Sequence, residues 1–162
     1  LNEAQQPNQI WAMDFMHDRV ASRSFRTFNV MDEANRKALG IDIGTSIPSE
    51  RVTRYLNQLV DIHGKPQALR CDNGPEFISQ TLADWAKDQC IELKFTQPGK
   101  PNQNALIERF NRSFRTEVLS CYLFDSLKEV EDVTQEWLYQ YNHVRPHDAL
   151  NGLTPVAFSE LL

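Results

Sequence analysis

Two short apolar runs in this chain each carry an aspartate at a place where a buried strand is expected. Asp14 lies within the run Ile10–Met16, and Asp72 ends the run Ala68–Asp72, which is followed at once by Asn73-Gly74-Pro75. Burying a carboxylate in a sheet is costly unless a cation or hydrogen-bond donors compensate for its charge. The sequence therefore predicts that two strands bring their aspartates to a functional site.

A third carboxylate, Glu108, lies in a segment with helical periodicity, with 35 residues between it and Asp72. Mg²⁺ prefers hard oxygen ligands and keeps several waters, so two or three carboxylates suffice to bind it. Such ions activate an attacking oxygen and stabilise a leaving one in phosphoryl transfer. We expect Asp14 to bridge two metal ions, Asp72 to hold one of them and Glu108 to hold the other.

The order of the expected elements indicates an α/β fold. Three strands with short connections favour an antiparallel meander, and the following strand–helix alternation favours parallel pairing with helices on the faces. The strands are expected at 9–15, 24–31, 37–43, 67–72 and 91–96, and the helices at 48–63, 75–90, 105–119 and 126–142. We predict a five-stranded mixed sheet with helices on both faces. It forms one domain over residues 1–162, with the core fold at 7–124 and a C-terminal helix and tail at 125–162.

Polar residues recur around Glu108 at helical spacing. Asn104, Glu108, Arg112 and Arg115 fall on one face, and Asn111 lies at its edge. A carboxylate followed by guanidinium groups suits a metal ligand beside a track of DNA phosphates. The same spacing also fits a surface ladder of ion pairs, because Glu108 and Arg112 are four residues apart. The preceding loop, 97–104, contains two prolines and is expected to act as a gate that orders on DNA binding.

The composition is that of an ordinary globular protein with a net negative charge. The formal net charge is −5, yet residues 94–115 hold five basic residues and one acidic residue, so a positive groove remains possible. The three cysteines form no Cys-x-x-Cys pair, which speaks against a zinc site or a disulfide framework and fits a reducing cytoplasmic compartment. No apolar run approaches the roughly 20 residues that span a bilayer, so no membrane contact is expected.

Four motifs follow one another in an order and at a spacing known from one family. They are Trp11-Ala12-Met13-Asp14-Phe15, then Asp72-Asn73-Gly74-Pro75-Glu76-Phe77, then Pro98-Gly99-Lys100-Pro101 through Asn104 to Glu108, and finally Tyr141-Asn142-His143-Val144-Arg145-Pro146-His147. Over about residues 7–158 the chain resembles the integrase-type catalytic core of bacterial insertion-sequence transposases. That family is similar to retroviral integrases and belongs to the DDE superfamily. Close members more often carry Ser and Gly where Arg109 and Arg112 stand here.

The resemblance implies a ribonuclease-H-like fold and a metal-dependent polynucleotidyl transferase that cleaves and transfers DNA strands in transposition. It implies Asp14, Asp72 and Glu108 as catalytic residues and metal ligands, with Mg²⁺ or Mn²⁺ as cofactor. DNA contacts are expected from a further set of residues, namely Lys100, Asn104, Asn111, Arg112 and Arg115. The implied partners are transposon ends, target DNA and further copies of the chain, in a dimer or larger assembly in the bacterial cytoplasm. Because the chain does not begin with Met, the family's N-terminal helix-turn-helix region is expected to be missing.

Two other functions stay open. A ribonuclease-H-type nuclease or a junction resolvase shares the carboxylate site, although the spacing before Glu108 and the tail motif favour the transposase. A catalytically silent DNA-binding or assembly module would keep the fold, although the intact acids speak against it. Of the remaining acids, Asp18 and Asp32 are expected near turns and in solvent, and Glu76 is expected to stabilise a helix N-terminus.

Overall fold

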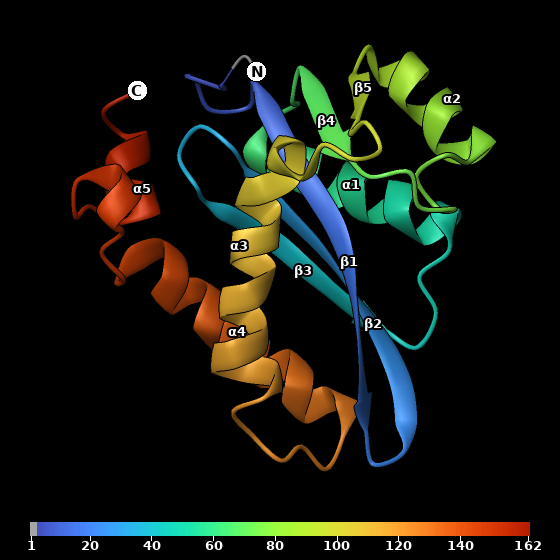
Figure 1. Ribbon diagram of the computed structural model, residues 1–162, viewed down its shortest axis with the longest axis vertical. Coiled ribbons are helices and arrows are strands. Elements are labelled where there is room, and N and C mark those ends of the chain that lie inside the picture. Colours follow the sequence, from blue (N-terminus) through green and yellow to red (C-terminus); the bar gives the residue numbers. More distant parts are fainter. Residues whose placement is uncertain (1–2) are drawn as a thin grey trace.

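The computed structural model describes residues 3–162, which form three layers around a five-stranded sheet (Figure 1). The strands lie in the order β3-β2-β1-β4-β5. Neighbours β1 and β2, and β2 and β3, are antiparallel, whereas β4 is parallel to both β1 and β5. Their bounds are Ile10–Val20 (β1), Arg23–Asp32 (β2), Ala38–Gly44 (β3), Ala68–Cys71 (β4) and Glu92–Phe95 (β5). The predicted fold class, a mixed sheet with three antiparallel strands first, is confirmed.

Helices cover both faces of the sheet, because its strands alternate apolar side chains between two buried clusters. One face packs against α1 (Ser49–His63) and α2 (Gln80–Gln89), and the other against α3 (Ala105–Phe114) and α4 (Leu127–His143). Figure 1 shows α3 and α4 on the near side of the sheet and α1 behind it. The remaining helical segments are short: 3₁₀ turns at Pro101–Asn104 and Asp148–Leu150, a π turn at Arg115–Leu119, and α5 (Pro155–Ser159). Within residues 3–162, no helix has both the length and the apolar character needed to cross a membrane.

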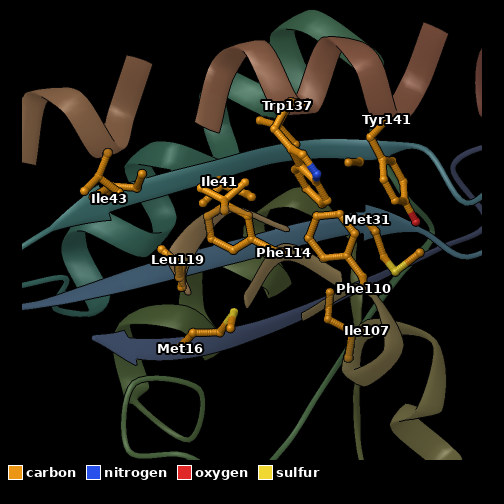
Figure 2. Close-up of a cluster of buried hydrophobic side chains, with 14 of the residues drawn as sticks. Met16, Met31, Ile41, Ile43, Ile107, Phe110, Phe114, Leu119, Trp137 and Tyr141 are labelled. Atoms are coloured by element: carbon orange, nitrogen blue, oxygen red, sulfur yellow. The ribbon is translucent and has the colours of Figure 1, made fainter. Parts of the chain in front are cut away.

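Aromatic side chains hold α3 against α4 and the sheet (Figure 2). The Phe110 ring lies 5.6 Å from Trp137 and 5.3 Å from Tyr141, centroid to centroid, and Phe114 lies 5.3 Å from Trp137. Such pairs add to the free energy gained from burying the rings. The position of α3, and of every polar residue on its exposed side, therefore depends on this cluster.

Three element boundaries differ from the prediction by about five residues. Strand β1 continues past Phe15 to Val20 and turns into β2 through Ala21 and Ser22, which both have positive φ. Helix α2 begins at Gln80, not near 75, because the Ser79 hydroxyl caps it by accepting a hydrogen bond from the Leu82 amide at 3.2 Å. The helix predicted over 105–119 is regular only to Phe114 and ends in the π turn.

The C-terminal motif has a structural role at the sheet edge. Asn142 donates its side-chain N–H to the Ala38 carbonyl and accepts the Ala38 N–H, both at 2.8 Å. It thus replaces a neighbouring strand at the start of β3, which is one of the two edge strands of the sheet. The Tyr141 carbonyl lies 3.1 Å from His147 Nε2, and Arg145 pairs with Glu117. The motif therefore closes the end of α4 and covers the exposed edge.

Replacing Asn142 with Ala should lower the free energy of unfolding by about 2 kcal/mol, because it leaves a buried backbone N–H and C=O unpaired. We expect Asn142→Asp to be no more stable than Asn142→Ala, because it would place a buried carboxylate oxygen against the Ala38 carbonyl oxygen. Urea unfolding measures the change, and the exposed neighbour His143→Ala is the control. Equal stability of Asn142→Ala and the control would contradict the edge-capping role.

Candidate functional site

The pairing of β1 with β4 determines where the two aspartates lie. The paired residues are Ile10 with Ala68, Trp11 with Leu69 and Ala12 with Arg70. Continuing this register by two residues places Asp14 beside Asp72, just beyond the last paired position. The two carboxylates therefore meet at the point where β4 ends.

The predicted carboxylates line a single pocket of about 260 Å³. Asp14 comes from β1, Asp72 follows β4, and Glu108 comes from the first turns of α3. The complete lining is Asp14, Asp72, Thr96, Gln97, Gly99, Lys100, Asn104 and Glu108. Residues far apart in the sequence, including the predicted Lys100 and Asn104, thus converge on one concave surface.

The Asp14 carboxyl group is perturbed by its surroundings. Burial raises the pKa of Asp14 to about 6, and the neighbouring Asp72 carboxylate contributes to this rise through its charge and a hydrogen-bonding contact. Asn111 opposes the shift by donating its side-chain N–H to Asp14 Oδ2 at 3.0 Å. A buried carboxylate beside another acid is destabilised in its charged form, and a bound cation would remove that penalty.

The turn after β4 holds Asp72 in place. Asp72 Oδ1 accepts the Gly74 amide at 2.8 Å, and Asn73 donates its side-chain N–H to the Thr96 carbonyl at 2.9 Å. A Cβ atom at residue 74 would lie only 3.0 Å from Asp72 Oδ1, so Gly74 leaves room for that carboxylate. The expected turn at Asn73-Gly74 thus presents Asp72 to the pocket.

The carboxylates that line the pocket provide part of a binding site for a divalent cation. The Asp14–Asp72 pair supplies hard oxygen ligands whose charges need compensation. Glu108 is exposed and lines the same pocket. Among the described His, Cys, Asp and Glu residues, no three are grouped closely enough to hold one ion. The pocket thus contains a preformed pair and a third carboxylate on its wall.

The other polar residues of α3 have different surroundings. Arg112 is exposed and makes no ion pair with Glu108 among the described side chains, so the surface ladder considered above does not form there. Arg115 donates to the His17 carbonyl at 2.9 Å and lies 3.5 Å from the Asp18 carboxylate. Asn104 is buried, caps no helix with its side chain, and leaves its Oδ1 without a partner among the described atoms.

Two expectations about further acids are wrong. Asp32 is only 1% exposed, because its carboxylate accepts the amides of Asn8 at 2.7 Å and Ala34 at 2.9 Å. Glu76 lies before the start of α2 and instead pairs with Arg26. The same guanidinium lies 4.0 Å from the centre of the Phe15 ring, so it joins the turn after Asp72 to β1 and β2.

Asn29 is not among the predicted site residues, yet it lies on β2 directly opposite Asp14 in the ladder. Asn29 is fully buried and donates to Asn111 Oδ1 at 2.7 Å. The sequence gives only a weak indication of this role. Asn29 is a single amide between Phe28 and Val30, in a strand that packs between the two apolar cores.

Comparison with known proteins places this geometry in a family. Two sequence families, both described as integrase core domain, match residues 4–101 and 89–155. The chain is 38% identical over 154 residues to an uncharacterized 39.2 kDa protein of insertion element IS476 from Xanthomonas euvesicatoria, covering 94% of this chain and 44% of the relative. It is 39% identical to an uncharacterized 31.7 kDa protein of insertion element IS407 from Burkholderia multivorans, covering 94% and 56%. The chain thus spans about half the length of these relatives.

A solved structure supports the fold assignment. The catalytic core domain of HTLV-2 integrase, determined in complex with magnesium in a dimeric form, matches with a TM-score of 0.76 at 21% identity. The match covers 95% of this chain and 97% of that one. The fold is therefore that of retroviral integrase cores, which is ribonuclease-H-like. By these family matches, which together span most of its length, this chain belongs to the integrase core domain family.

Proposed function

We propose that this chain is the catalytic core of an insertion-sequence transposase, a divalent-metal-dependent polynucleotidyl transferase. The observation that carries the proposal is the pair of strand-borne carboxylates, Asp14 and Asp72, held together in a pocket that Glu108 also lines. In the first step, water attacks a phosphodiester, the bond from phosphorus to the 3′-oxygen breaks, and a 3′-hydroxyl is freed. In the second, this hydroxyl attacks a target phosphodiester and displaces a new 3′-hydroxyl.

Each carboxylate has a role that follows from its position. Asp14 and Asp72 would hold divalent ions jointly, because their half-buried carboxylates lie side by side. Glu108 would complete the ligand set from α3. Bound Mg²⁺ or Mn²⁺ supplies activation of the attacking oxygen and compensation of charge on the phosphate. The surrounding protein fixes the ligands, since the Asp72 turn and the Asn111 hydrogen bond restrict both aspartates.

We expect DNA contacts from basic side chains that are exposed or that line the pocket. Lys100 lines the pocket and Arg112 is exposed on α3, so both are free to contact phosphates. The buried, unpartnered Oδ1 of Asn104 offers an acceptor beside the reacting groups. Asn111 and Arg115 are engaged within the protein, and we propose DNA contact for neither. The loop before α3 would close over the DNA, and further copies of the chain would assemble on it.

The test uses this protein with DNA duplexes that carry insertion-element ends. Asp14→Asn, Asp72→Asn and Glu108→Gln should each remove Mn²⁺-dependent cleavage and strand transfer while the far-ultraviolet circular dichroism stays unchanged. A labelled RNA–DNA hybrid, offered in parallel, should remain intact. Cleavage of the hybrid alone would favour a ribonuclease, and activity in any of the three variants would refute the assignment.

Mn²⁺ binding should depend on pH in the range where Asp14 titrates. Because the pKa of Asp14 is raised to about 6, the cation competes with a proton below that pH. The apparent affinity should fall about fivefold from pH 6 to pH 5, about tenfold in all from pH 7 to pH 5, and stay nearly constant from pH 7 to pH 8. Titration calorimetry measures this, with Asp125→Asn as a distant acidic control. A natural-protein affinity that is equal at pH 5 and 7 would contradict the assignment of Asp14 as a ligand.

A further inference from the structure

A chain of side-chain amides connects the centre of the sheet to Asp14. Asn29 on β2 donates its N–H to Asn111 Oδ1 at 2.7 Å, and Asn111 on α3 donates its own to Asp14 Oδ2 at 3.0 Å. Three elements, β2, α3 and β1, are thereby joined by two hydrogen bonds. Asn29 itself is fully buried and also lies 3.2 Å from Met16 Sδ, so its amide has a defined place in the core.

The direction of these two hydrogen bonds determines how the Asn111 amide is oriented. A carboxamide has one end that accepts and one that donates, and the two ends exchange when the group rotates by half a turn. Because Asn29 presents a donor to Asn111, the oxygen of Asn111 must face Asn29. The N–H₂ group of Asn111 then faces Asp14. The reverse orientation would bring two N–H₂ groups together and place a carbonyl oxygen against the Asp14 carboxylate.

We propose that Asn29 is a positioning residue that acts on Asp14 through Asn111, by fixing which end of the Asn111 amide faces the carboxylate. This rests on the proposed function, in which Asp14 binds a divalent cation. The same bond ties α3 to β2 one turn after Glu108, so Asn29 also limits movement of that helix relative to the aspartate pair.

A purely structural role does not explain why an asparagine stands at position 29. Its Oδ1 is buried and has no partner among the described atoms, which is an unfavourable arrangement in a core. An apolar side chain of similar size would avoid that cost. What such a side chain would lose is the donor that orients Asn111.

The strand provides a matched control. Thr27 lies two residues earlier on the same face of β2, is fully buried, and has a hydroxyl without a partner among the described atoms. It makes no hydrogen bond to Asn111 or Asp14. Thr27→Val therefore removes a buried polar group of the same strand without touching the amide chain.

The experiment measures Mn²⁺ affinity by calorimetry, and kcat and KM for DNA, on this protein. Asn29→Leu should bind Mn²⁺ about tenfold more weakly, lower kcat, leave KM for DNA unchanged and keep the melting temperature. Asn29→Asp, whose carboxylate draws the N–H₂ of Asn111 away from Asp14, should lose more. Asn29→Ser, which keeps a donor and reduces the risk of misfolding, should recover part of the affinity. Thr27→Val should match the natural protein.

Two results would overturn the inference: Mn²⁺ affinity in Asn29→Leu and Asn29→Ser equal to that of the natural protein, or an equal loss in Thr27→Val. Failure of the underlying function has a different signature. In that case the natural protein and Asp14→Asn would take up Mn²⁺ to the same extent, whatever stands at position 29.

Discussion

Asp14→Asn should abolish Mn²⁺-dependent DNA cleavage, by at least about a thousandfold, and at the same time stabilise the metal-free chain. Both effects have one cause, the half-buried negative charge at residue 14. As a ligand, that charge is needed to bind the cation. Without the cation it lies beside Asp72 in a place that disfavours ionisation, which is why its pKa is raised from 3.8 to about 6.

The direction of the stability change follows from the protonation equilibrium. The folded state holds the Asp14 proton more tightly than the unfolded state, so the contribution of this group to stability is complete below about pH 4 and is lost as pH rises through about 6. At neutral pH the loss amounts to at most about 3 kcal/mol. Asparagine keeps the shape, still accepts from Asn111 and carries no charge. We expect a gain of about 2 kcal/mol, or roughly 4–8 °C in melting temperature.

Differential scanning calorimetry in EDTA at pH 7.5 measures this gain. Asp125→Asn changes the net charge equally at an exposed position and serves as the control. The difference in stability between Asp14→Asn and the natural protein should shrink on acidification to pH 4. A variant that is less stable than the natural protein at pH 7.5 would show that the Asp14 charge is compensated within the protein and needs no cation.

Phe110→Ala should have the largest effect on stability, a loss of about 3–5 kcal/mol. Phe110 is 1% exposed and packs against Trp137 and Tyr141, so its removal leaves a cavity between α3, α4 and the sheet. Helix α3 carries Glu108 and Asn111, and loosening it should separate both from Asp14. We therefore expect weaker Mn²⁺ binding in addition to the lower stability.

Guanidinium chloride unfolding and calorimetry test these two effects. Phe95→Ala removes the same side chain from a position that is 39% exposed and should cost much less. Phe110→Leu should restore most of the stability and the Mn²⁺ affinity. If Phe110→Ala bound Mn²⁺ like the natural protein under conditions where it is folded, the helix would not need this packing to hold the site.

The sheet and the convergence of the carboxylates could be predicted from the sequence because both depend on local patterns. The apolar runs at residues 10–16 and 68–72 mark β1 and β4, and the two aspartates stand out as charges within them. Parallel pairing of those strands then implied that Asp14 and Asp72 meet, as the register of β1 and β4 bears out. The assignment of catalytic roles to these residues stays a prediction.

The parts that could not be predicted depend on tertiary contacts. The early start assigned to α2 followed from Pro75, whereas the Ser79 hydroxyl determines where that helix begins. Asp32 near a turn looked solvated, yet backbone amides from distant segments surround it. The orientation of the Asn111 amide depends on Asn29, 82 residues earlier, and no local pattern connects the two.

The most direct test of the account is an anomalous-scattering map from crystals of this chain soaked in Mn²⁺. We expect a peak bonded to carboxylate oxygens of both Asp14 and Asp72, on the side of the pocket lined by Glu108. No peak at the aspartate pair, or Mn²⁺ bound only among the acidic residues between Asp125 and Glu136, would contradict it.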